Sequence, residues 1–224
     1  MNSSKIERKR LWQAAIKWPL YSVAVMPLLL AAGWKIGQGE GIQIRQFLGF
    51  LIASILILFW ENLTNDLFDN DTGVDQFKLH SVVALVGKKA PVSQIAYLSL
   101  ALGLLLTLLL ALKSNLIVLP LILVCCCLGY LYQGPPFRLG YKGLGEPLCW
   151  LAFGPLATTA ALLVLSPKSH VIANTTWPTA SLISAGPALA TTLVLFCSHF
   201  HQVNQDAKHG KNSPLVVLGT RRGA

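Results

Sequence analysis

Residues 47–69 read FLGFLIASILILFWENLTNDLFD, and this stretch decides the fold class. The first fourteen residues carry no charge, whereas three carboxylates follow in the next nine. A surface helix of a soluble protein would be polar along one face, and this run is not. The whole chain of 224 residues is 54% hydrophobic and 12% charged, against about 25% charged residues in ordinary soluble domains. We therefore expect a helix within a membrane whose end carries acidic side chains.

Further apolar runs approach the roughly 20 residues that a helix needs to cross a bilayer. The first run is long, lacks a small-residue cleavage pattern and has five more runs behind it, so it is not read as a cleavable signal. The sequence thus predicts an all-α, multi-pass transmembrane helical bundle. Its six predicted spans lie at about 18–34, 47–62, 93–112, 115–132, 148–165 and 181–200.

The charged residues predict an orientation. Fourteen of the 18 lysines and arginines fall in the N-terminal arm, the second and fourth connections and the C-terminal segment, which places these segments and the N-terminus on the cytoplasmic side. The net charge of +9 comes mostly from these cytoplasmic cations. It therefore predicts anionic lipid as a neighbour and argues against nucleic-acid binding. Eight of the nine acidic residues share that side. Because isolated charges near hydrocarbon are costly, carboxylates packed among basic loops at one membrane face suggest that a metal and an anion bind there.

The acidic stretch itself predicts the metal. If its helix continues to about residue 70, then Asn62, Asp66 and Asp69 fall at i, i+4 and i+7 and share one face toward the bundle interior. Asp75 is then free to fold back from the connection that follows. Oxygen ligands suit a hard divalent cation, and Mg²⁺ is typically held by few carboxylates together with substrate phosphates. The stretch therefore predicts an Mg²⁺ site.

Two simpler interpretations compete for this stretch. A calcium loop of the EF-hand type beginning at Asp69 fails, because its sixth position is Val74 instead of glycine and its twelfth is His80 instead of glutamate. A merely solvated polar connection stays open on these residues alone. The five cysteines show no metal-binding spacing, and we interpret them as small packing residues.

Two later segments add cations and a second polar face. Residues 130–147 read YLYQGPPFRLGYKGLGEP; the two prolines interrupt a helix and the glycines allow close approach of a ligand. Arg138 and Lys142 in this turn suit phosphate oxygens, although each is also an ordinary cytoplasmic cation. Near the C-terminus, His199, Gln202 and Asp206 fall at i, i+3 and i+7.

Three segments together resemble the UbiA superfamily of membrane prenyltransferases. These are NDLFDNDTGVD (65–75), YQGPPFRLGYKGLGE (132–146) and DAKHGKNSPLVVLG (206–219), each after an even-numbered span and in the family order. The resemblance covers nearly the whole chain. Within the superfamily, HSVVALVG (80–87) and the Gly-x-Asp before it are most similar to the branch that prenylates 1,4-dihydroxy-2-naphthoate, and HQV (201–203) is similar to its phytyl-using members.

The resemblance implies Mg²⁺-dependent transfer of a phytyl or polyprenyl chain from its diphosphate to 1,4-dihydroxy-2-naphthoate, with loss of CO₂, in phylloquinone or menaquinone biosynthesis. It implies metal ligands at Asn62, Asp66, Asp69 and Asp206. It implies catalytic roles for Asp66, Asp69, Asp75, Arg138 and Lys142. It implies substrate contacts at Asn62, Asn65, Tyr132, Arg138, Lys142, Gln202 and Lys211.

The resemblance also sets expectations about completeness and alternatives. Because the family has nine spans, the chain is expected to be a single domain over residues 1–224 that is incomplete at its C-terminus. A homogentisate or other aromatic acceptor is the alternative within the family. A cation or phosphate transporter is the alternative outside it, although transporters more often carry charge near the membrane midplane. The short basic arm shows no transit peptide, which favours a bacterial inner membrane or a photosynthetic membrane.

Overall fold

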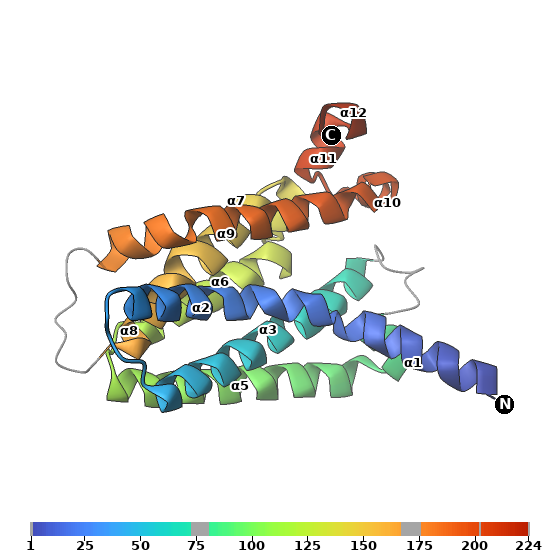
Figure 1. Ribbon diagram of the computed structural model, residues 1–224. Helices are drawn as coiled ribbons and strands as arrows, with labels where there is room; N and C mark the ends of the chain where they lie inside the picture. Colours follow the sequence, from blue (N-terminus) through green and yellow to red (C-terminus); the bar gives the residue numbers. More distant parts are fainter. Residues whose placement is uncertain (1, 73–80, 167–175, 202, 224) are drawn as a thin grey trace.

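The computed structural model describes residues 2–72, 81–166, 176–201 and 203–223, and every regular element in these ranges is helical. The all-α prediction is therefore confirmed. The longer helices lie side by side in one bundle (Figure 1). The elements are α1 (Asn2–Ile16), η1 (Trp18–Tyr21), α2 (Ser22–Gly37), α3 (Ile44–Thr72), α4 (Val82–Val86), α5 (Lys89–Lys113), α6 (Val118–Gln133), η2 (Leu139–Lys142), α7 (Gly145–Leu151), η3 (Ala152–Leu156), α8 (Ala157–Leu165), α9 (Thr176–Ser198), η4 (His199–His201), α10 (Val203–Lys208), α11 (Pro214–Leu218) and α12 (Thr220–Gly223).

Each predicted span corresponds to helix in the structure. Within the described residues, four helices are long and apolar enough to cross a membrane, namely α3, α5, the continuous α7–η3–α8 and α9. The other two, α2 and α6, are apolar but shorter, at 16 residues each. The multi-pass helical architecture is thus confirmed, while the count of six spans stays a prediction.

Small side chains let the helices pack closely. Gly103 of α5 lies against α3, where an added Cβ would come within 2.8 Å of Ile57 Cγ1. Ser99, one turn earlier, donates a hydrogen bond of 2.7 Å to the Leu56 carbonyl of α3. A hydroxyl that bonds a helix carbonyl satisfies its own donor within an apolar environment. This contact fixes α5 against the half of α3 that leads to its acidic end.

The fifth predicted span is bent. A π-type turn, η3, joins α7 to α8, and Gly154 within it has non-helical dihedral angles ahead of Pro155. An added Cβ on Gly154 would lie 2.8 Å from the Ala188 Cβ of α9, so glycine permits the two helices to touch. The bend is a departure from the single regular helix expected at 148–165, and proline and π-turns are its usual causes.

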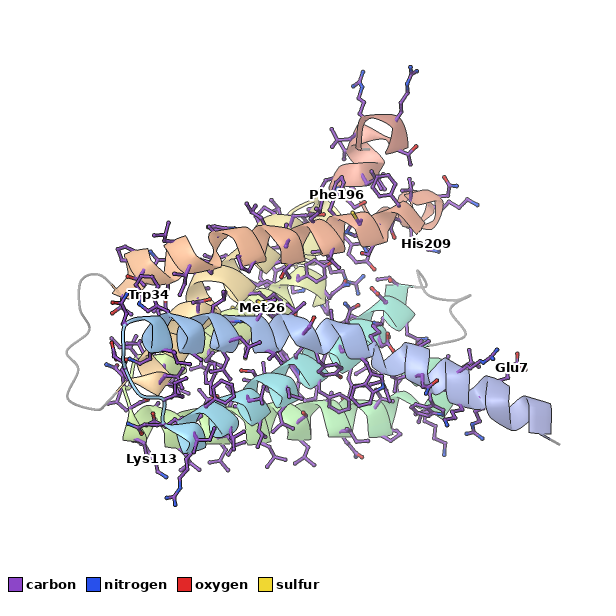
Figure 2. The ribbon with its side chains drawn as sticks, viewed as in Figure 1. Glu7, Met26, Trp34, Lys113, Phe196 and His209 are labelled. Carbon is purple, nitrogen blue, oxygen red and sulfur yellow. The ribbon has the colours of Figure 1, made fainter. Side chains whose placement is uncertain are left out.

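The two ends of the bundle carry different segments. Glu7 and His209 lie toward one end, and Trp34 and Lys113 toward the other (Figure 2). At the second end, Lys35 forms an ion pair with Glu40. The sequence predicts the N-terminal arm and the C-terminal segment at one end, with Lys35 and Lys113 at the other, and the structure agrees (Figure 2). Which end faces the cytoplasm stays a prediction.

Candidate active site

A cavity of about 520 Å³ opens between α2, α3, α6, the bent α7–α8 helix and α9. This volume is in the range of small-molecule sites. Its wall is mostly apolar and includes Phe50, Ile122 and Phe153. Polar side chains also line it, among them Lys17, Asn62, Asn65, Asp69, His199 and Lys211. The cavity therefore offers charged groups beside a long apolar wall.

The predicted stripe on α3 exists. Asn62, Asp66 and Asp69 are 3%, 1% and 6% exposed, as expected for residues that share the inner face of a helix reaching Thr72. Their partners differ, however. Asp66 Oδ2 accepts the backbone N–H of Val82 at 2.7 Å, whereas Asp69 lines the cavity. One carboxylate thus anchors α4 and the other faces the space where a ligand fits.

Lys17, at the end of the N-terminal arm, completes this side of the cavity. Its Nζ donates a hydrogen bond of 2.9 Å to Asn62 Oδ1 and lies 3.8 Å from Asp66 Oδ1. Sequence analysis counted Lys17 only as an arm cation. Its position directly before the first apolar run was the sole signal that it lies at a membrane boundary.

The connection after α6 folds over Tyr132. Added Cβ atoms on Gly140 and Gly145 would lie 2.8 and 2.6 Å from the Tyr132 ring, so both positions require glycine. Tyr132 lines the cavity. Beside it, Gln133 Nε2 donates a hydrogen bond of 2.9 Å to Asn65 Oδ1. The last residue of α6 thereby fixes the amide of Asn65, one of the predicted substrate contacts.

Tyr141, which sequence analysis did not single out, joins the acidic end of α3 to this connection. Its hydroxyl donates to Asp69 Oδ1 at 3.1 Å and lies 2.9 Å from the Thr72 hydroxyl. Burial raises the pKa of the Tyr141 phenol, and the negative charge of Asp69 raises it further. The phenol is therefore protonated at neutral pH and available as a hydrogen-bond donor.

Cations surround the Tyr141 ring. The Arg138 guanidinium carbon and Lys211 Nζ lie 5.9 and 5.5 Å from its centroid, distances at which a cation is attracted to an aromatic face. Arg138 Nε is buried without a hydrogen-bond partner in the part of the chain that the structure describes. Lys142, the other predicted cation of this turn, is exposed.

The C-terminal segment supplies a second buried carboxylate. Asp206 is fully buried; its Oδ2 lies 3.3 Å from His199 Nδ1 and its Oδ1 3.8 Å from Lys211 Nζ. His199 Nε2 lies 3.7 Å from Glu146 Oε1, so the imidazole stands between two carboxylates. The backbone N–H of Asn212 bonds the Tyr141 carbonyl at 2.8 Å. The structure therefore brings the second and third sequence segments together.

Some predicted residues are not placed in the site. Asp75 and Gln202 lie outside the described residues, as does His80. Asp71 is exposed and pairs with Lys89, so it lies off the buried stripe. All five cysteines are free thiols; Cys126 is buried, as a packing residue would be, whereas Cys127 and Cys197 are exposed.

The side chains that could act as metal ligands can be compared with what a divalent cation requires. Among the described residues, no three Asp, Glu, His or Cys side chains lie close enough together to hold an ion by themselves. Asp206 Oδ1 is buried and accepts no hydrogen bond within the described part of the chain, and Asp69 lines the cavity. Mg²⁺ is usually bound by one or two carboxylates plus substrate phosphates, so the residues fit an ion that binds together with a phosphate ligand.

Comparison with known proteins gives a consistent set of matches. The UbiA prenyltransferase family matches residues 20–224. The chain is 46% identical over 226 residues to a chloroplastic 2-carboxy-1,4-naphthoquinone phytyltransferase of Arabidopsis thaliana, covering 98% of this chain and 58% of that protein. It is 44% identical over 217 residues to a 2-carboxy-1,4-naphthoquinone phytyltransferase of Synechocystis, covering 96% and 68%.

A more distant relative is a 1,4-dihydroxy-2-naphthoate octaprenyltransferase of Mycobacterium tuberculosis, at 28% identity over 203 residues, which covers 89% of this chain and 66% of the relative. The chain thus spans between about half and two thirds of the length of these proteins. No solved structure matches it significantly.

Proposed function

The chain belongs to the UbiA prenyltransferase family, and from that premise we propose that it transfers a phytyl or polyprenyl chain from its diphosphate to 1,4-dihydroxy-2-naphthoate. The reaction depends on Mg²⁺ and releases CO₂ and diphosphate. The two relatives above 40% identity are both named as phytyltransferases of a carboxylated naphthoquinone, which favours phytyl as the chain and a carboxylated bicyclic ring as the acceptor.

The observation that carries this proposal is the form of the cavity. A prenyl diphosphate has a head with several negative charges and a long hydrocarbon tail, and the cavity combines Lys17, Lys211 and Asp69 with an apolar wall. A soluble phosphate would make no use of such a wall, whereas a hydrocarbon tail packs against it, as in sites that pair an apolar wall with a few polar groups. The match to both halves of the ligand supports a prenyl diphosphate.

The chain's own residues would hold the diphosphate at the polar side of the cavity. Lys17 and Lys211 balance its charge, and Arg138, which shares the Tyr141 ring with Lys211, has a buried Nε without a partner among the described residues. Asp69 and Asp206 would hold Mg²⁺, which when bound withdraws charge from the leaving diphosphate. Fixed charges of this kind stabilise a transition state because they need no reorganisation when the C–O bond ionises.

The wall of the cavity protects the product of ionisation. An allylic cation is captured by any water that reaches it, and the aliphatic and aromatic side chains of Phe50, Ile122 and Phe153 exclude water from the tail region. The electron-rich naphthoate ring is then the nucleophile that remains. Loss of CO₂ from the carbon that receives the prenyl group restores the aromatic ring.

The polar residues of the cavity support a diphosphate site at one face of the membrane. The polar residues of the cavity belong to segments at the end of the bundle where Glu7 and His209 lie (Figure 2). We propose that this end is cytoplasmic or its equivalent, since it also carries most of the lysines and arginines. The N-terminus then faces the cytoplasm or stroma, and the surrounding membrane is bacterial or photosynthetic.

The test is a panel of acceptors. Membranes containing the protein are incubated with Mg²⁺, phytyl diphosphate and either 1,4-dihydroxy-2-naphthoate, homogentisate or 4-hydroxybenzoate, and products are identified by mass spectrometry. We expect a phytylated naphthoquinol, released CO₂ and little product from the monocyclic acceptors. Comparable product from homogentisate and none from the naphthoate would show that homogentisate is the acceptor and the naphthoate is not. Uptake of phosphate or cations into vesicles without any product would support the transporter alternative instead.

A further inference from the structure

Glu61 is an acidic residue that lines the cavity away from the cluster at the end of α3. It lies four residues before Asn65 and eight before Asp69, so the three share one face of the helix and all line the cavity. At 1.5 Å per residue, Glu61 is about 12 Å from Asp69 along the helix axis, toward the apolar middle of α3. It therefore stands well away from the proposed diphosphate position.

The opposite wall leaves room for the Glu61 carboxyl. The Glu61 carboxyl group faces Gly129 of α6, where an added Cβ would lie 3.1 Å from Glu61 Oε1. Any other side chain at that position would press on the carboxyl group. A glycine here lets the carboxyl group lie between two helices while it remains on the cavity surface.

Within the described residues, nothing satisfies the Glu61 carboxyl group. The side-chain hydrogen bonds and ion pairs of these residues include none to its oxygens, and the two lysines of the cavity are directed elsewhere, Lys17 to Asn62 and Lys211 toward Asp206. Its thiol neighbour Cys125 lies in hydrogen-bonding position to the Ala152 carbonyl. A carboxylate in apolar surroundings without a partner is costly, and a ligand that brings a donor would recover that free energy.

We propose that the Glu61 carboxylate binds and orients the aromatic acceptor by accepting a hydrogen bond from one of its ring hydroxyl groups. A neutral hydroxyl group can donate to this carboxylate, and Leu148, which also lines the cavity, offers an apolar contact for a planar ring. A hydroxylated aromatic ring supplies both the donor and the ring. This assignment rests on the proposed function and names the residue that distinguishes hydroxylated from unsubstituted acceptors.

The test compares ligands that differ only in their donors. Dissociation constants are measured under anaerobic conditions, with Mg²⁺ and inorganic diphosphate, for 1,4-dihydroxy-2-naphthoate, its dimethyl ether and 2-naphthoate. The wild-type protein should prefer the dihydroxy compound over both others by about tenfold or more, as expected for a hydrogen bond to a charged group. In Glu61→Met that preference should fall to within twofold, with Glu61→Gln between the two. Glu7→Met, the same change on the exposed side of α1, should keep the full preference.

The outcomes separate this proposal from the proposed function. No preference in the wild-type protein, or an equal preference in Glu61→Met, would overturn the role of Glu61 even if transfer occurs. If Glu61→Met fails to fold, Glu61→Gln decides the matter, and an unchanged preference in that variant would overturn the role of Glu61. A Glu61-dependent preference in a protein that transfers no chain would leave the binding site intact and overturn the proposed transfer.

Discussion

Replacement of Tyr141 by phenylalanine removes one oxygen atom from the proposed diphosphate site and leaves the ring in place. The phenol donates to Asp69 Oδ1 at 3.1 Å, and a hydrogen bond to a charged group contributes about 1.5–3 kcal/mol. The ring also lies beside Arg138 and Lys211, and those contacts persist in the variant. If the bond orients Asp69 for the transition state, kcat/KM for the prenyl diphosphate should fall about ten- to 150-fold, at 1.36 kcal/mol per tenfold.

The assay is prenyl transfer in proteoliposomes at several prenyl diphosphate concentrations, with the amount of folded protein measured by size-exclusion chromatography. Tyr97→Phe is the matched control, because Tyr97 is half exposed on α5, and it should change kcat/KM by less than twofold. Since the pKa of Tyr141 is raised above that of an ordinary phenol, the wild-type and Tyr141→Phe profiles should run parallel between about pH 7 and 10. Wild-type activity in Tyr141→Phe, or a similar loss in Tyr97→Phe, would refute the reasoning.

Three further predictions concern the same end of the bundle. Asp69→Ala should lower transfer at least a hundredfold, whereas Asp71→Ala should keep more than half of it, because Asp71 is exposed and paired with Lys89; equal losses would contradict a special role for Asp69. Lys17→Met should weaken prenyl diphosphate binding about tenfold in a titration at low salt, and unchanged binding would exclude Lys17 from the site. Single cysteines at the exposed positions Lys208 and Glu40, in a background without native cysteines, should react with impermeant maleimides from opposite sides of the membrane; reaction of both from one side would refute the topology.

The helices and the buried stripe of α3 followed from local patterns. Apolar runs of near-membrane length predict helices because an unpaired backbone is so costly in lipid, and the spacing of Asn62, Asp66 and Asp69 places them on one face in any regular helix. What the pattern could not show is that Asp66 bonds Val82 while Asp69 bonds Tyr141. The two carboxylates have the same chemistry, and only the segments packed around them make them different.

Other features depended on contacts between distant residues. Lys17 and Asn62 are 45 positions apart, and a lysine beside an apolar run is indistinguishable from any other arm cation. Glu61 was one of five acids near the acidic stretch, and its orientation toward Gly129 depends on how α6 packs against α3. The bend at Gly154 could have been suspected from the Gly-Pro pair, yet such a pair also occurs at helix ends.

We propose above all that the cavity holds a prenyl diphosphate with its head between Asp69 and Lys211. The most direct measurement is a cryo-electron microscopy structure of the protein with Mg²⁺ and a non-reactive thiolodiphosphate analogue of the phytyl substrate. We predict density for the diphosphate beside Asp69, Lys17 and Lys211, and density for the chain along the apolar wall near Phe50 and Ile122. A head group bound at the opposite end, near Lys35, or a cavity that stays empty at saturating analogue would contradict the account.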